Sequence, residues 1–218
     1  MSINVLVVSE NPTYNGSILK PLCVRLLQEC ARPRANIEVL ANPRTNGYEH
    51  AKSLFPRTIL DLYSHKHLVL FLPDSDGLDR SLEFSRMETE FAQEAATSGK
   101  SLQLICCAAV PEVEAWLLAG HSDKWEPDWQ WGAMRADRSI KENYFTRFLE
   151  MHGQDRARYP DGGRKQLIAE ALRNYTAIKQ RCPELQELES RVRGHIARFE
   201  QFDAFQPPFF PLLQSKRP

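Results

Sequence analysis

The apolar run at residues 68–72 (LVLFL) is followed at once by residues 73–77 (PDSDG). A short apolar run bounded by turn residues predicts a buried strand, and ligands bind at the carboxyl ends of strands in open parallel sheets. In an extended segment alternate side chains point the same way, so Asp74 and Asp76 are expected to converge. The pattern predicts a site for a divalent cation, although Asp-Ser-Asp-Gly can also form a simple turn.

The surrounding chain alternates short apolar runs with helix-like patterns. Strands are predicted at residues 3–8, 37–40, 68–72 and 102–106, and helices at residues 17–31, 48–63 (interrupted at Pro56) and 81–98. This alternation is typical of βαβ units, so residues 1–120 are expected to form an α/β domain with an open, mainly parallel sheet flanked by helices. Beyond it, a loop at 121–133 and helices at 164–181 and 185–202 predict a helical C-terminal extension, residues 121–218, packed on that domain.

Composition narrows the classes of function. The chain of 218 residues has 28 Lys+Arg and 28 Asp+Glu, so no overall charge points to nucleic acid or to a membrane surface. Its five cysteines show no Cys-x-x-Cys spacing, which favours free thiols in a reducing cytoplasm. The sequence has no export signal, no apolar run of about 18 residues and no glycine-rich nucleotide loop, so we expect no membrane association.

Further acids are expected at the same edge of the sheet. If the first and third strands are neighbours, Glu10 stands beside Asp74 and Asp76, and the fourth strand leads to Glu112 and Glu114. Converging carboxylates repel one another unless a cation holds them, and Mg²⁺ prefers oxygen ligands. These five residues are therefore candidate metal ligands, although acids at 112 and 114 can also simply favour the first turn of a helix.

These motifs resemble the TOPRIM domain of topoisomerases, primases and several nucleases. The matching residues are Glu10 in VVSE, and Asp74 and Asp76 in FLPDSDG. Residues 111–118 (PEVEAWLL) look like a segment of small stand-alone bacterial TOPRIM-like proteins, relatives of OLD-type and RloB-like nucleases that are uncharacterised or defence-associated. In those proteins a glutamate ahead of the tryptophan accompanies the acidic core, and Glu114 matches it. The resemblance covers residues 3–120.

The resemblance implies a TOPRIM-like, Rossmann-like fold and a Mg²⁺- or Mn²⁺-dependent endonuclease acting on DNA or RNA. Glu10, Asp74, Asp76 and Glu114 would be its catalytic residues, and an ATPase partner in anti-phage defence is implied as well. TOPRIM glutamates are commonly followed closely by glycine, whereas here residues 11–15 (NPTYN) intervene before Gly16. A non-catalytic module that binds an ATPase and a phosphohydrolase that acts on nucleotides remain alternatives. Oligomeric state is left open.

Two features lie in the predicted extension. Residues 161–165 (DGGRK) precede a helix, so Arg164 and Lys165 are candidate ligands for a nucleic-acid phosphate, although the glycines can merely supply a flexible turn. Trp125, Trp129 and Trp131 could stack on bases or form an apolar cluster beneath a loop.

Overall fold

Four parallel strands form the sheet at the centre of the computed structural model, which describes residues 2–152 and 163–205. The sheet order is β2-β1-β3-β4, with register pairs such as Val7↔Val39 and Val8↔Phe71. The strand bounds are β1 (Asn4–Val8), β2 (Asn36–Val39), β3 (Leu68–Phe71) and β4 (Gln103–Cys106). The predicted α/β class with a parallel sheet is confirmed, and the arrangement is consistent with a Rossmann-like fold.

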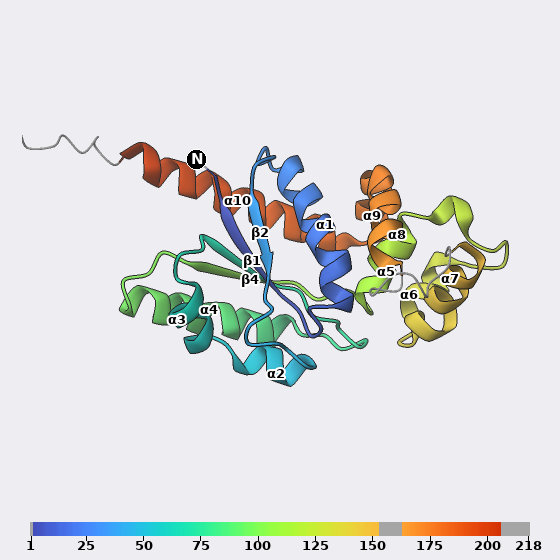
Figure 1. Cartoon of the computed structure of the whole chain (residues 1–218), viewed down its shortest axis with the longest axis horizontal. Coiled ribbons are helices and arrows are strands. Elements are labelled where there is room, and N and C mark those ends of the chain that lie inside the picture. Colours follow the sequence, from blue (N-terminus) through green and yellow to red (C-terminus); the bar gives the residue numbers. More distant parts are fainter. Residues whose placement is uncertain (1, 153–162, 206–218) are drawn as a thin grey trace, which may run out of the picture.

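The central strands β1 and β3 are almost wholly apolar because helices cover both faces of the sheet. Val5 and Val7 pack into one hydrophobic cluster with α1 (Tyr14–Glu29) and α10 (Pro183–Phe205). Leu6 and Val8 pack into a second cluster with α2 (Tyr48–Ser53), α3 (Arg57–Tyr63) and α4 (Ser81–Thr97). Figure 1 shows these two helical layers on opposite sides of the strands. Burying each such valine or leucine contributes about 1.5–3 kcal/mol, so the alternation of side chains fixes which face each helix covers.

The C-terminal part adds helices to the same core. Its elements are α5 (Val113–Ala119), α6 (Trp131–Ala136), α7 (Thr146–His152), α8 (Arg164–Ala171), α9 (Tyr175–Arg181) and α10, with short turns at Ser122–Lys124, Lys141–Phe145 and Leu172–Asn174. Trp116 of α5 and Ile178 of α9 are fully buried in the cluster that contains Val5 and Val7. The predicted extension thus shares one hydrophobic core with the sheet.

Close approach of α5 and α8 depends on a glycine. A Cβ at Gly120 would lie 2.6 Å from the Cβ and 2.8 Å from the carbonyl oxygen of Ala171. Gly120 directly follows α5, and Ala171 is the last residue of α8. Any larger side chain there would push the two helices apart, so this contact sets how α8 lies against α5.

Some predicted boundaries differ from the structure. The helix predicted at 164–181 is divided by the turn Leu172–Asn174, and α6 begins at Trp131 inside the predicted loop. The tryptophans explain this second difference, because they pack rather than face solvent. Trp131 stacks on Trp125 with ring centres 5.6 Å apart, and its indole N–H donates to the Arg181 carbonyl at 3.0 Å. With Trp129 buried as well, the apolar-cluster alternative is confirmed.

The wiring of the sheet creates a topological switch point at its carboxyl edge. From β1 the chain crosses one face through α1 to reach β2, whereas α4 joins β3 to β4 across the other face. The strand order therefore reverses between β1 and β3, and this switch point is where open α/β sheets bind ligands. No helix in the described ranges is both long and apolar enough to cross a membrane.

Candidate acidic site at the carboxyl edge of the sheet

Glu10 and Asp74 meet at the switch point. Val8 and Phe71 are partners at the ends of β1 and β3, and the two acids follow these strands by two and three residues. The Asp74 backbone N–H donates a hydrogen bond to Glu10 Oε1 at 3.2 Å. The two acids therefore lie together at the same edge of the sheet, as predicted.

Asp74 is the centre of the group of acids. Its Oδ1 accepts the Val113 N–H at 2.8 Å at the start of α5, and its Oδ2 accepts the Asn15 side-chain amide at 3.2 Å. Burial raises the pKa of Asp74 well above its usual range, and so do the negative charges of Glu114, Glu10 and Glu112, whereas the Val113 N–H lowers it. Four acids from three segments of the chain therefore act on one another here.

Asp76 lies in a turn rather than in an extended segment. Its φ of +52° is in the left-handed region, and its side chain is 58% exposed, with Arg80 at 3.6 Å. The turn forms because the N–H groups of Ser75 and Asp76 both donate to the Pro111 carbonyl, at 2.9 and 3.1 Å. The prediction of an extended Asp74–Asp76 pair is therefore wrong in its geometry. Asp76 still acts on Glu10: burial first and the Asp76 charge second raise the pKa of Glu10 to about 6.

Glu112 and Glu114 lie at the N-terminus of α5, Glu112 as the N-cap residue and Glu114 in the first turn. Burial raises the pKa of Glu112 to about 7, with Glu114 and Glu142 adding to the effect. The Glu112 Oε2 atom is buried and accepts no hydrogen bond within the described residues. Glu114 is 3% exposed and pairs with Arg164, whose guanidinium nitrogen lies 3.4 Å from its Oε1. The two acids therefore differ in their partners: Glu114 pairs with Arg164, whereas the charge and the N–H of Lys141 lower the pKa of Glu112 only in part.

The two predicted phosphate ligands lie in different environments. Arg164 is 9% exposed and lies between the rings of Tyr14 and Phe145, with its guanidinium carbon 5.0 Å from each ring centre. It therefore stabilises Glu114 from inside the protein. Lys165 is exposed. Gly163 has φ +77°, a left-handed conformation that glycine adopts without strain, and Asp161 and Gly162 lie outside the described residues.

The donor chemistry of the site fits a hard divalent cation. Carboxylate oxygens are the ligands that Mg²⁺ and Mn²⁺ prefer, and the buried Glu112 Oε2 has no hydrogen-bond partner among the residues that the structure describes. The coordination shell is not preassembled, since no group of three or more His, Cys, Asp or Glu side chains in residues 2–152 and 163–205 is arranged to hold a metal ion. Glu10, Asp74, Asp76, Glu112 and Glu114 therefore supply charge and donors, but side chains must reorient to enclose an ion.

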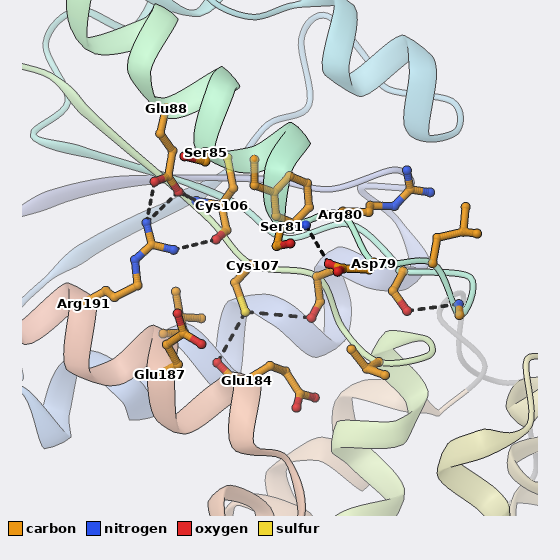
Figure 2. Close-up of a pocket in the computed structure, with 17 residues that line it drawn as sticks. Asp79, Arg80, Ser81, Ser85, Glu88, Cys106, Cys107, Glu184, Glu187 and Arg191 are labelled. Carbon is orange, nitrogen blue, oxygen red and sulfur yellow. Dashed lines mark hydrogen bonds and ion pairs between the residues drawn. The ribbon is translucent and has the colours of Figure 1, made fainter.

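A cavity of about 510 Å³ adjoins the acidic loop on the β4 side (Figure 2). Arg191 of α10 reaches across it to α4 and donates to both carboxylate oxygens of Glu88 at 2.6 Å, and also to the Cys106 carbonyl at 3.0 Å. The Cys106 N–H in turn donates to Glu88 at 2.6 Å. The pair thus satisfies backbone groups at the open edge of β4, which would otherwise be available to another strand.

Sequence reasoning missed several residues that shape this region. Asn15 holds Asp74, Arg80 lies beside Asp76, and Arg191 closes the strand edge with Glu88. Arg80 is only four residues from Asp76, but the partners of Asn15 and Arg191 come from other elements; Glu88 and Arg191 are 103 positions apart. Only the fold brings these side chains together.

No protein-family model, curated protein or solved structure matches the chain at a significant level.

Proposed function

We propose that the protein is a TOPRIM-like, metal-dependent nuclease that hydrolyses phosphodiester bonds of DNA or RNA. The observation that carries the proposal is the Asp74 carboxylate at the switch point of the sheet, whose pKa is raised first by burial and then by the charges of Glu114, Glu10 and Glu112. Gathering like charges in a buried position costs stability. Such an arrangement is typical of sites where charge is used for chemistry.

In this proposal each acid of the site has a distinct role. Asp74 and Asp76 would hold a Mg²⁺ or Mn²⁺ ion after their side chains reorient, with Glu112 as a further oxygen donor. The bound ion would stabilise negative charge on the phosphodiester and lower the pKa of water. Glu10, with a pKa of about 6, is suited to accept a proton from the attacking water near neutral pH. Glu114 is oriented by Arg164 and completes the site.

The test is cleavage of plasmid, linear DNA, single strands and total RNA with Mg²⁺, with Mn²⁺ or with chelator. Asp74→Asn is compared with Asp61→Asn, which alters an exposed aspartate of α3 that pairs with Lys100 ahead of β4, away from the carboxyl edge of the sheet. We expect cleavage by the wild type and by the Asp61 variant, and none by the Asp74 variant or in chelator. Cleavage that survives in chelator or in Asp74→Asn would contradict the proposal.

A second candidate function is a non-catalytic TOPRIM-like module that binds a partner ATPase. It is favoured by the hydrogen bonds that already occupy both Asp74 oxygens, and by the arginines beside Asp76 and Glu114. Inactivity on every substrate together with stable binding of an ATPase would support this module. The TOPRIM resemblance suggests that either form works with an ATPase in anti-phage defence, in the bacterial cytoplasm.

A further inference from the structure

A basic groove lies between α1 and α8. It has a volume of about 850 Å³. Four charged side chains line it within the described residues, and all four are cationic: Lys20, Arg25, Lys165 and Arg173. The whole chain has equal numbers of acidic and basic residues, so a groove lined by one sign of charge is a local feature that attracts an anionic ligand.

Both walls of the basic groove begin at the acidic site. On α1, Asn15 donates to Asp74 and the next residue, Gly16, lines the groove. On α8, Arg164 pairs with Glu114 and the next residue, Lys165, lines the groove. A polyanion held along the groove would therefore have one end beside the carboxylates.

The lining between the cations is apolar. Val24 of α1 is 37% exposed, and Val39 and Leu172 contribute to the same surface. Cations spaced along an apolar surface suit a single strand, which offers phosphates together with accessible sugars and base faces. A duplex stacks its bases inside and offers chiefly phosphates, so it would leave this apolar surface unused.

We propose that the basic groove binds a single-stranded segment of nucleic acid and leads its backbone to the acidic site. This rests on the proposed nuclease function and extends it, because it assigns a binding surface and the strandedness of the bound segment. Arg25 already pairs with Glu29 at 2.6 Å, so its charge is largely neutralised. The attraction of the groove for phosphates is therefore tested by replacing the exposed Lys20 and Arg173.

Counterion release gives the expected size of the effect. For single strands the logarithm of the binding constant falls with the logarithm of salt concentration by about 0.7 per neutralised phosphate, so the three cations other than Arg25 give a slope of roughly −2. Removing two contacts should reduce the slope by about 1.4. At about 0.1 M salt this corresponds to a loss of affinity of about 25-fold.

The experiment is fluorescence anisotropy with labelled single-stranded DNA and RNA and with a duplex of the same sequence, in chelator so that nothing is cleaved. Lys20→Glu/Arg173→Glu is compared with Arg57→Glu/Arg86→Glu, which makes the same charge change on exposed residues of α3 and α4 across the sheet. Lys20→Gln/Arg173→Gln removes the charges without adding acids. Circular dichroism verifies that each variant folds.

We expect a strong and salt-dependent loss of single-strand binding in both groove variants and little change in the α3/α4 control. Equal losses in groove and control variants, or duplex binding as tight as single-strand binding, would overturn the inference. Cleavage by the wild type with undiminished binding by the groove variants would also overturn it while leaving the nuclease proposal intact. Groove-dependent binding without any cleavage would support the groove and count against the nuclease.

Discussion

Replacing Glu10 with glutamine tests whether the acidic site is electrostatically strained. Glutamine keeps an oxygen able to accept the Asp74 N–H bond and removes one negative charge. Burial and Asp76 raise the pKa of Glu10 from 4.5 to about 6. One pKa unit corresponds to about 1.36 kcal/mol, so the full shift corresponds to a loss of folding stability of about 2 kcal/mol. Solvent screening of this partly exposed group reduces that loss to about 1 kcal/mol. Glu10→Gln should raise the free energy of unfolding by about that amount at about pH 8, without divalent metal.

The pH dependence gives this prediction its sign. Below pH 4.5 Glu10 is protonated in both the folded and the unfolded chain, so the charge costs nothing there. Between pH 4.5 and about 6 the unfolded chain releases the proton first, so wild-type stability falls as pH rises, and above about 6 the full cost remains. Denaturation followed by circular dichroism in chelator should show a gain in Tm of about 2–4 °C at about pH 8 and little gain near pH 4.5.

Glu90→Gln, at an exposed position of α4, is the matched control and should change Tm little at either pH. A Glu10 variant that is less stable than the wild type at about pH 8 would refute the reasoning. So would a gain of equal size at both pH values, because a packing effect does not titrate.

Three further predictions concern the ion and the packing around the site. Mn²⁺ should raise the Tm of the wild type but not of Asp74→Asn, which thermal denaturation measures. The affinity for Mn²⁺ should fall on acidification because protons compete for the carboxylates; calorimetric titration measures this affinity, and equal binding by the variant would count against the site. Gly120→Ala should cost about 2 kcal/mol or more in chemical denaturation, since its Cβ would meet α8, whereas Gly132→Ala, with no atom within 4 Å of the added Cβ, should cost nothing measurable. Arg191→Lys should lower the free energy of unfolding by about 1–2 kcal/mol, because lysine cannot replace the paired bonds to Glu88; an unchanged midpoint would show that the bridge is dispensable.

The sheet was predictable because its strands are short, apolar runs that must be covered on both faces. Such runs cannot be left at a surface, and the helix-like patterns between them leave parallel pairing as the simple solution. The division of the 164–181 helix was not predictable, since it depends on how α8 and α9 each pack against α5. Helix position follows local periodicity, whereas helix breaks follow contacts made by distant residues.

The site, like the fold, was predictable where it follows from strand order and not where it depends on contacts between distant segments. That Glu10 and Asp74 share one edge follows from strand order alone. The turn at Asp76 does not follow from strand order, because its backbone N–H donates to the Pro111 carbonyl, which lies in the loop after β4. Arg164 was correctly placed at the start of a helix, but its burial depends on the rings of Tyr14 and Phe145, which no local pattern reveals.

The distribution of compensating charge separates a structural cluster of acids from a binding site. Arg164 neutralises Glu114 and Arg80 lies beside Asp76, but no ion pair within the described residues involves Glu10, Asp74 or Glu112. These same three acids have raised pKa values, so each favours a proton or another cation over its bare charge. A purely structural cluster would be stabilised by a basic partner at each acid, and this chain has as many basic residues as acidic ones to provide it. Arg80 and Lys141 lower the pKa values of Glu10 and Glu112 only in part, because both pKa values stay raised. Under the proposed function, a hard divalent ion would supply the remaining positive charge, since it prefers oxygen ligands.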